Sequence, residues 1–341
     1  MTISLRRIKH DSKKETITVN ISIIIAARNE EENIKSLVDY LKKLDYPTDM
    51  LEIILVDDNS IDRTFDRWRE ETESLPYFKI LKAEKSGMSG KRDALTLGIK
   101  SSMYPFILIT DADCHPEKDW LKFYSNKFTQ GYDMVFGITP FYEHKNLVNK
   151  VSCFENLKNS ILSFSMASIN LPISASARSF GFSKSAFYSI GGYEKTKDSI
   201  SGDDDLLLRE AINSKLRIGA VTEPGSFVFS NTKKTFSDYF RQKARHTQSS
   251  FYYLKKHQLI LGFWHSLNLC FVFSPILMFI NPLFGILLPA KLLIDISIVK
   301  STQIKFSYSF SMIEIIYLQL FYEVFLIIHF LNAGFRKIKW K

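Results

Sequence analysis

Cysteine is scarce in this chain, and its scarcity excludes several classes of protein. Three cysteines, Cys114, Cys153 and Cys270, are scattered over 341 residues, with no CxxC pair and no mixed Cys/His spacing of the kind that binds zinc. An odd, scattered set of thiols predicts no disulfide framework, which fits a reducing, cytosolic environment. Cys114 stands beside a pair of aspartates, but we interpret it as a small buried apolar residue.

Glycine is also scarce, with 14 residues, and both glycine-rich signatures of phosphate-binding loops are missing. Neither GxGxxG, which marks a dinucleotide-binding turn, nor the P-loop pattern GxxxxGK[ST] occurs. The turn that follows the first apolar run is acidic instead, with Glu30, Glu31 and Glu32. These carboxylates suit the start of a helix, so we do not expect a phosphate there. They could also accept hydrogen bonds from a base or a ribose, as could Asp57 or Asp58 at the next strand end.

The N-terminal residues 1–19 have no apolar run of secretory length, so we expect no signal peptide in them. They are basic and polar, and we interpret them as a flexible arm. The formal net charge of the chain is +9, and 45% of its residues are apolar. Its length fits one large α/β domain followed by an appendage, and the apolar excess is concentrated after residue 258.

Short apolar runs recur in the first 140 residues, with segments of helical periodicity between them. The runs cover residues 21–25, 51–56, 78–81, 106–110 and 134–139. The first predicted helix carries on one face Ile34, Leu37, Val38, Leu41 and Leu44, and further helices are expected over 117–128 and 146–169. This alternation predicts an α/β fold, with a mostly parallel, Rossmann-like sheet flanked by helices.

The run over 106–110 leads into two carboxylates, Asp111 and Asp113. Ligands of open α/β sheets bind at the carboxyl ends of the strands, and two carboxylates that face one way repel each other unless a cation lies between them. A hard divalent cation that carries a substrate diphosphate fits this position. Alternatively, both are solvated loop residues, or Asp113 caps a helix that begins near Pro116.

Two further stretches place an excess of charge at the start of a helix. In SGKRDAL, Lys91 and Arg92 stand where cations oppose the helix dipole, so we expect an anionic ligand beside them. Three aspartates, Asp203, Asp204 and Asp205, precede an apolar run. Since one or two would suffice to cap a helix, the excess is a candidate general base.

Positive charge and apolar residues are segregated in the C-terminal third of the chain. Residues 231–257 contain seven lysines and arginines against Asp238 alone, and residues 257–290 carry no formal charge. A basic segment before an apolar block is typical of a cytoplasmic juxtamembrane region. The apolar block is longer than one bilayer crossing requires, and Asn281-Pro282 is its natural break. We therefore predict membrane spans over about 259–280 and 283–299.

Charged residues within the apolar segments qualify this prediction. The second span contains Lys291 and Asp295, whose i, i+4 spacing allows them to neutralise each other. A third apolar segment, over about 307–331, contains Glu314, Glu323 and His329. Because carboxylates are costly in lipid, we expect it to lie in the membrane interface or against its neighbours. The alternative to all three is a buried, soluble helical domain.

Together these motifs resemble those of family 2 glycosyltransferases of the GT-A fold, in their membrane-attached bacterial form. Five motifs stand in the family's order within residues 20–250: AARNEEENI, LVDDNSID, SGKRDAL, TDAD and GDDDL. QKARH follows where the family has QxxRW. Two positions depart from the family pattern, because His246 replaces the usual Trp and Ser179 replaces the usual Asn.

The resemblance implies an inverting transfer of a sugar from a nucleotide-diphosphate sugar, expected to be a UDP-sugar, to a hydroxyl of a lipid-linked or polysaccharide acceptor. It implies Mg²⁺ or Mn²⁺ on Asp111 and Asp113, with Asp111 also engaging the ribose. The general base would be Asp204 if Gly202-Asp203-Asp204 is aligned with the family's acidic motif, and Asp203 if Asp205-Leu206 is the anchor. The other implied residues bind the donor nucleotide (Ala27, Arg28, Glu30, Asp57, Asp58 and Lys91) or the diphosphate and acceptor (Gln242, Arg245 and His246).

The same resemblance implies the domain organisation. A GT-A catalytic domain over 20–230 would follow the arm, then a basic juxtamembrane segment over 231–257 and a membrane region over 258–341. We expect a multi-pass protein of the inner membrane with a cytoplasmic catalytic domain. Two full crossings and one interfacial segment suit the basic tail at 336–341, which also prefers the cytoplasm. The expected partners are the donor, the acceptor and membrane lipids, without nucleic acid.

Other classes of protein fit these residues less well. A haloacid-dehalogenase-type phosphatase also has Asp-x-Asp after an apolar strand, but normally after its first strand. A nucleotidyltransferase usually has a glycine-rich, basic first turn, whereas this turn is acidic. A non-catalytic membrane scaffold, or another protein that binds nucleotide sugars, is the remaining alternative. A scaffold, however, has no reason to keep metal carboxylates and a candidate base together.

Overall fold

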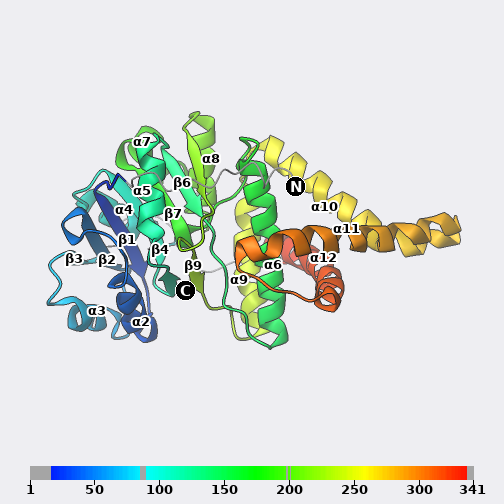
Figure 1. Cartoon of the computed structure of the whole chain (residues 1–341), viewed down its shortest axis with the longest axis horizontal. Coiled ribbons are helices and arrows are strands. Elements are labelled where there is room, and N and C mark those ends of the chain that lie inside the picture. The colour runs from blue at the N-terminus through cyan, green and yellow to red at the C-terminus, as the bar shows by residue number, and fades with distance from the viewer. Residues whose placement is uncertain (1–16, 85–89, 197–198, 200, 336–341) are drawn as a thin grey trace. The chain divides into compact units, whose positions relative to one another are not determined.

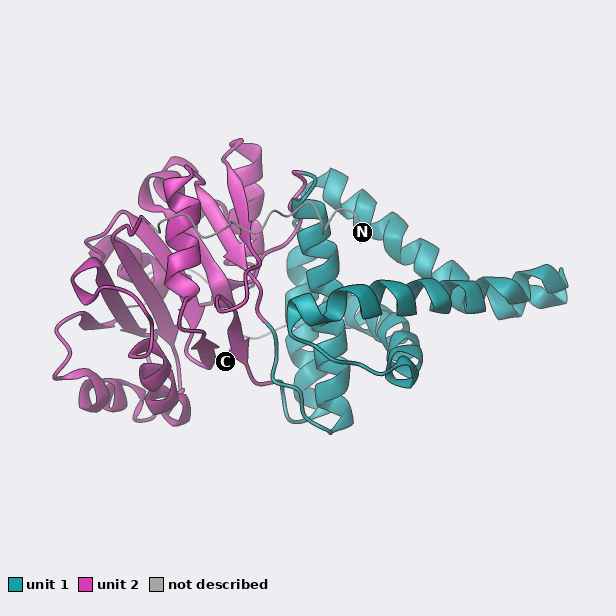
Figure 2. Cartoon of the chain, viewed as in Figure 1, with its two compact units in different colours: residues 1–7, 140–169, 232–338 teal, residues 8–139, 170–231, 339–341 magenta. Residues whose placement is uncertain are grey.

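The computed structural model of this chain describes residues 17–84, 90–196, 199 and 201–335. Within these, the chain divides into two compact units (Figure 2). The sheet unit comprises 17–139 and 170–231, and the helical unit comprises 140–169 and 232–335. Residues 140–169 thus belong to the helical unit, although in sequence they lie within the 20–230 segment. Most of the N-terminal arm, residues 85–89 (with Ser89 of the SGKRDAL motif) and the tail 336–341 lie outside the described residues.

A seven-stranded sheet in the order β3-β2-β1-β4-β7-β6-β8 forms the sheet unit (Figure 1). Its strands are β1 (Ile21–Ala27), β2 (Leu51–Asp57), β3 (Phe78–Lys82), β4 (Phe106–Asp111), β6 (Met134–Gly137), β7 (Phe180–Ser183) and β8 (Ile218–Val221). All neighbouring strands are parallel except that β7 runs antiparallel to both β4 and β6. The predicted mostly parallel α/β sheet is confirmed, but the antiparallel strand inside it was not predicted.

Helices cover both faces of this sheet, because alternate residues of a buried strand point to opposite sides. Ile21, Ile23 and Ile25 of β1 share one core with α2 (Glu31–Leu41), α3 (Thr64–Thr72) and α5 (Trp120–Thr129). On the opposite face, α4 (Arg92–Ser101) lies so close to β1 that a Cβ on Gly98 would be 2.4 Å from Ile24 Cγ2. Two shorter helices complete the unit, α7 (Lys184–Ser189) and α8 (Asp205–Asn213).

Several predicted boundaries differ from the structure. The first helix ends at Leu41, so Leu44 lies beyond it, although Leu44 is still buried in the same core. The helix predicted from residue 117 begins at Trp120, and its N-cap is Asp119. Residues Cys114–Pro116 form β5 instead, which pairs with β9 (Val228–Ser230) in a small second sheet. The alternative interpretation of Asp113 as a helix cap is therefore wrong.

Five main helices make up the helical unit: α6 (Leu147–Ala167), α9 (Phe236–Ser250), α10 (Lys255–Phe273), α11 (Leu287–Thr302) and α12 (Met312–Phe335). Three segments are long and apolar enough to cross a membrane, namely Lys255–Phe279, Pro282–Phe306 and Met312–Gly334. The predicted break at Asn281-Pro282 is confirmed, because short 3₁₀ turns there separate α10 from α11. By length and composition the third segment also qualifies as a span, which goes beyond its predicted interfacial placement.

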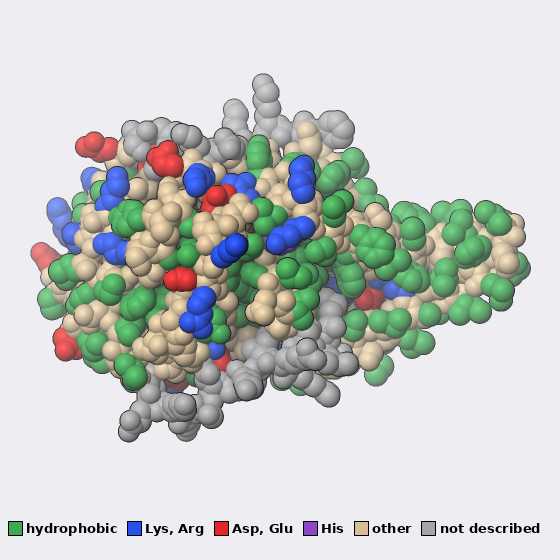
Figure 3. Space-filling model, turned by 90° about the horizontal axis from the view of Figure 1, so that it is seen from above, with side chains coloured by type: hydrophobic (Ala, Val, Ile, Leu, Met, Phe, Trp, Pro, Cys, Tyr) green, Lys and Arg blue, Asp and Glu red, His purple; other side chains and the backbone are tan. Residues whose placement is uncertain are grey.

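Most apolar residues of α10 and α11 face outward rather than into a core. Only 6% of the most apolar stretch of Lys255–Phe279 is buried, and hydrophobic side chains dominate the surface of α10 and α11 in Figure 3. Exposed apolar area on this scale marks an interaction with a membrane or a partner. It disfavours the alternative of a buried, soluble helical domain.

Four charged side chains of the helical unit, two cations and two anions, form a buried cluster. Lys291 Nζ lies 2.5 Å from Asp295 Oδ2, which confirms the predicted pairing within α11. Lys158 of α6 lies 3.1 Å from Asp295 Oδ1, and Glu323 of α12 lies 3.4 Å from Lys291 Nζ. The cluster, hereafter the four-charge cluster, is formally neutral and joins three helices.

Candidate active site

The carboxyl ends of β1, β2 and β4 lie level with one another at one edge of the sheet. In the pairing register, Ala27 is opposite Asp57 and Ala26 is opposite Asp111. The loops that follow these three strands therefore start side by side. This brings together the residues predicted from the AARNEEENI, LVDDNSID and TDAD motifs.

The loops after β1 and β2 are bonded to each other. Asn29 adopts the left-handed backbone conformation, with φ of 55°, and its side-chain oxygen accepts a hydrogen bond from Ile61 N at 2.9 Å. Its own backbone N–H donates to Ser60 Oγ, and Glu30 N donates to Thr64 Oγ1. The Glu30 carboxylate accepts a bond from the Asn33 side chain at 2.7 Å. These contacts fix the acidic turn as part of one rigid edge.

Asp57 and Asp58 are both buried but have different surroundings. Asp57 Oδ1 accepts a hydrogen bond from Ser60 N at 3.3 Å, so it closes its own turn. Burial raises the pKa of Asp58, and the nearby positive charge of Arg28 only partly offsets this. Of these two aspartates, Asp58 is therefore the one that lies near Arg28. Both Arg28 and Asp58 were predicted to bind the donor nucleotide.

Lys91 joins two carboxylates that are far apart in sequence. Its ammonium group pairs with Asp111 Oδ1 and lies 3.1 Å from Asp203 Oδ2. Burial alone would lower the pKa of Lys91, but the charges of Asp111 and Asp203 raise it above its usual range. The anions beside this predicted ligand-binding cation are therefore carboxylates of the chain itself.

Arg92, which the sequence grouped with Lys91, has a structural explanation. Its side chain is buried and donates hydrogen bonds to the carbonyl oxygens of Ser199 and Ser201, at 2.5 and 2.8 Å. It therefore holds the segment that leads into Asp203. An anionic ligand is not needed to account for this cation.

The two aspartates of TDAD converge with a thiol. Ligand atoms of Asp111, Asp113 and Cys114 all lie within 4.8 Å of one another. The thiol is fully buried and donates to Asp113 Oδ1 at 3.7 Å, and burial raises its pKa well above the usual value. A neutral thiol is a poor ligand for a hard cation, whereas two carboxylates are good ones. The donor set therefore fits Mg²⁺ or Mn²⁺ on the aspartates, with Cys114 as buried support.

The three consecutive aspartates have three different environments. Asp204, not Asp203, is the N-cap of α8 and accepts from Asp205 N at 2.7 Å; its second oxygen accepts from Ala177 N at 2.7 Å. Asp205 accepts from Ala175 N at 3.0 Å. Burial and then the charges of Asp205 and Asp203 raise the pKa of Asp204 to about 8. Asp203 does not cap the helix and faces Lys91.

Arg178 is a residue of this region to which the sequence assigned no role. Its guanidinium donates to Ser230 Oγ at 2.6 Å and to the Thr139 carbonyl oxygen at 2.8 Å, and its own carbonyl accepts from Thr110 Oγ1. It thus ties the end of β4 to β9. Its only sequence signal is an isolated cation in an uncharged stretch. Ser179 is fully buried and accepts from Trp120 Nε1 at 3.0 Å, so it packs against α5.

Gln242, Arg245 and His246 lie on α9 and belong to the helical unit. Arg245 Nη2 lies 3.5 Å from His246 Nε2, and the His246 side chain is exposed. On the same helix, Tyr239 and Phe240 pack against α12. The QKARH segment is therefore held by the helical unit and is described within that unit alone.

Comparison with known proteins gives consistent matches. Residues 22–188 match the family model described as "Glycosyl transferase family 2", and residues 106–330 match "Glycosyl transferase family group 2". A probable glycosyltransferase, YdaM of Bacillus subtilis, is 42% identical over 100 residues, covering 29% of this chain and 24% of YdaM. Beta-monoglucosyldiacylglycerol synthase of Synechocystis is 33% identical over 102 residues, covering 30% of this chain and 21% of the synthase.

These curated relatives are thus matched over about a quarter of their own length. Among solved structures, the mannosyltransferase PcManGT of Pyrobaculum calidifontis, in complex with GDP-Man and Mn²⁺, superposes with a TM-score of 0.63. The superposition covers 98% of this chain and 93% of that one, at 18% sequence identity, so the two chains share a fold.

Proposed function

Because the chain belongs to glycosyltransferase family 2, we propose that it moves a sugar from a nucleotide-diphosphate sugar, expected to be a UDP-sugar, to a hydroxyl of a lipid-linked or glycan acceptor. The observation that carries the proposal is the cluster at the carboxyl edge of the sheet, where Asp111 and Asp113 converge and Lys91 joins Asp111 to Asp203. Burying charges is costly, so a purely structural protein would gain little from this arrangement.

Asp111 and Asp113 would hold the divalent cation. Bound there, the ion would neutralise charge on the diphosphate leaving group. The Mn²⁺ in the complex of the Pyrobaculum mannosyltransferase supports this choice of metal class. Arg178 would support the site without binding the metal, because its hydrogen bonds hold the end of β4 against β9.

Lys91 would serve the donor in two successive ways. Without donor, its ammonium keeps Asp111 and Asp203 together and offsets their mutual repulsion. When the diphosphate arrives, the same ammonium would turn from Asp111 toward it. A preorganised cation of this kind stabilises the charge that develops on a leaving group.

Asp203 is the aspartate we assign as general base. Both oxygens of Asp204 are taken up by backbone N–H groups, and Asp205 holds Ala175. Among the described residues, no backbone N–H group donates a hydrogen bond to the Asp203 carboxylate in the contacts found. Lys91 lies between Asp203 and Asp111 and pairs with both. It would accept the proton of the acceptor hydroxyl while that oxygen attacks the sugar on the face opposite the diphosphate. This single displacement inverts the anomeric configuration.

The nucleoside would lie along the edge formed by the loops after β1 and β2. Ala27, Arg28 and Glu30 follow β1, and Asp57 and Asp58 follow β2. Hydrogen bonds join the two loops, and the buried carboxylates of Asp57 and Asp58 with the half-buried Glu30 supply hydrogen-bond acceptors along this edge. Acceptors of this kind suit the N–H groups of a base and the hydroxyls of a ribose.

The acceptor would approach from a membrane. With a catalytic domain over 20–230, a basic segment over 231–257 and a membrane region over 258–341, the acceptor hydroxyl would be presented at the cytoplasmic face, and Gln242, Arg245 and His246 would serve the diphosphate or the acceptor. The three long apolar helices support attachment to the membrane. Clustered lysines and arginines before them support a cytoplasmic catalytic domain.

Donor hydrolysis by purified full-length protein tests the proposal. With Mn²⁺ present, we expect nucleoside diphosphate to be released from one nucleotide sugar of a panel, and EDTA to abolish the release. Asp113→Asn should do the same without loss of folding, since the change removes charge and keeps volume. Asp45→Asn is the matched control, because Asp45 is an exposed aspartate paired with Lys122 outside the site. Binding without turnover for every donor would instead support a scaffold or a non-catalytic binding protein.

A further inference from the structure

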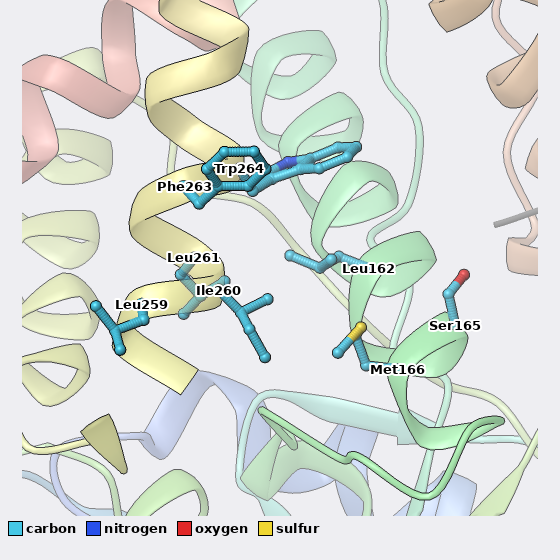
Figure 4. A pocket seen from close by; sticks show the side chains of 8 residues that line it. All are labelled: Leu162, Ser165, Met166, Leu259, Ile260, Leu261, Phe263 and Trp264. Atoms are coloured by element: carbon cyan, nitrogen blue, oxygen red, sulfur yellow. The ribbon is translucent and has the colours of Figure 1, made fainter. Parts of the chain in front are cut away.

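A groove of about 410 Å³ between α6 and α10 in the helical unit is lined by apolar side chains apart from Ser165 (Figure 4). An apolar lining does not distinguish one apolar molecule from another, so this groove identifies no ligand. Buried charged groups define a role more closely, because each needs partners of a particular kind. In the sheet unit, one such group is Arg92, the first residue of α4, which directly follows Lys91.

Arg92 holds the backbone just before Asp203. Its guanidinium donates from Nη1 to the carbonyl oxygen of Ser199 at 2.5 Å and from Nη2 to that of Ser201 at 2.8 Å. Arg92 is 1% exposed and both serines are 3% exposed, so bulk water does not replace these hydrogen bonds. Because the planar guanidinium presents its donors as a rigid fork, it fixes the positions of two backbone carbonyls at once.

Lys91 fixes a second point of the same stretch. Its ammonium lies 3.1 Å from Asp203 Oδ2 and also pairs with Asp111. Gly202 stands between the two fixed points, and its φ of 86° lies in the left-handed region that favours glycine. Two consecutive residues at the start of α4 thus determine where the Asp203 carboxylate lies, Arg92 through the backbone and Lys91 through the carboxylate itself.

We propose that Arg92 is a positioning residue for the general base. It holds the backbone before Asp203 so that the carboxylate is in place to accept the proton of the acceptor hydroxyl. This inference rests on the proposed function, in which Asp203 is that base. Displacement of a reacting group by about 1 Å can cost about 10²-fold in rate. Loss of the fork should therefore slow the transfer step and leave donor binding unchanged, because the residues proposed to bind the nucleoside lie on the loops after β1 and β2.

Arg92→Lys tests this role, because it keeps the buried positive charge and loses the fork. The assay uses full-length protein in detergent with Mn²⁺, the nucleotide sugar of the panel that releases nucleoside diphosphate, and water as the acceptor. We expect kcat to fall about 10²-fold with donor KM unchanged. Arg217→Lys is the matched control, because Arg217 is an exposed arginine that also donates to a backbone carbonyl, that of Gln130, and it precedes β8 outside the site.

A double-mutant cycle separates positioning from general damage to the protein. In an Asp203→Asn background the base is already lost, so Arg92→Lys should cause no further fall in kcat. Equal losses in the two backgrounds, or an unchanged kcat in Arg92→Lys alone, would overturn the proposal. Arg92→Gln, which removes the charge and the fork together, takes the place of Arg92→Lys in the cycle if the lysine variant does not fold.

The same cycle distinguishes failure of this inference from failure of the proposed function. If Asp203→Asn lowers kcat and Arg92→Lys does not, only the positioning role of Arg92 is wrong. If Asp203→Asn keeps the wild-type kcat, the assignment of Asp203 as general base is wrong, and the role of Arg92 is wrong with it.

Discussion

Replacing Lys91 with methionine removes the ammonium that joins Asp111 to Asp203 and keeps most of the side-chain volume. In the structure this ammonium pairs with one carboxylate oxygen of Asp111, a residue we assign as a metal ligand. A metal ion on that oxygen would have to displace Lys91 when the donor is absent. We expect Lys91→Met to bind Mn²⁺ more tightly than the wild-type protein.

The size of this effect follows from the interaction that the metal has to break. Hydrogen bonds to charged groups contribute about 1.5–3 kcal/mol, which corresponds to roughly 10- to 150-fold in the dissociation constant for Mn²⁺. Turnover should change in the opposite direction, because the diphosphate loses a buried cation. Loss of one preorganised group of this kind costs about 10²–10³-fold in kcat. Tighter metal and slower turnover in one variant is a combination that simple misfolding does not produce.

Calorimetric titration with Mn²⁺ in the absence of donor measures the first quantity, and release of nucleoside diphosphate measures the second. Lys100→Met is the control, because Lys100 is an exposed cation at the other end of α4 and its loss changes the net charge equally. An unchanged or weaker affinity for Mn²⁺ in Lys91→Met would refute the competition between lysine and metal.

Four further outcomes are expected. Asp203→Asn should lower kcat by roughly 10²–10⁴-fold, as for loss of a general base, with little change in donor KM. A larger loss of kcat in Asp204→Asn would show that Asp204 is the general base instead. The free energy of unfolding should fall as the pH rises from 3.8 toward about 8, because folded Asp204 keeps a proton there that the unfolded chain has lost; denaturant titrations of Asp204→Asn at pH 5 and 8 should show a weaker dependence. Asp295→Asn should destabilise the protein by about 3–5 kcal/mol, read as a lower Tm in detergent, because two buried lysines lose their shared partner. Full-length protein should stay in the membrane fraction after a carbonate wash, with the sheet unit open to protease from the cytoplasmic side only.

The central strands could be predicted from the sequence because of their burial. β1, β2 and the middle of β4 are buried, so each is a mostly apolar run, and β2 and β4 each end at an aspartate. β7 and β8 have four residues each, and β9 has three. β6 also has four residues, but it lies within the longer, mostly apolar run 134–139, whereas β7 has only Phe180 and Phe182, separated by a glycine. The antiparallel strand was missed for this reason.

The candidate site was predicted as a set of residue types but not as a set of contacts. Strand ends and helix starts indicated Lys91, Asp111 and the three aspartates, since charge there has no local explanation. The pairing of Lys91 with Asp111 and Asp203 depends on tertiary structure, because these residues come from three separate elements. The capping role went to Asp204 rather than Asp203 because α8 begins at Asp205. A shift of the helix start by one residue would therefore change which of the three carboxylates faces the site.

The four-charge cluster has a consequence for how the chain is made. Lys291 and Asp295 are one turn apart on α11, so within the span 283–299 they neutralise each other and this part of the helix can enter a bilayer on its own. Glu323 of α12 has its cationic partner on α11, not on its own helix. We therefore expect α12 to be retained at the translocon, or to enter protonated, until α11 is in place. The helices would then insert into the membrane in the order of the chain, because α12 can pair Glu323 with Lys291 only after α11 has inserted.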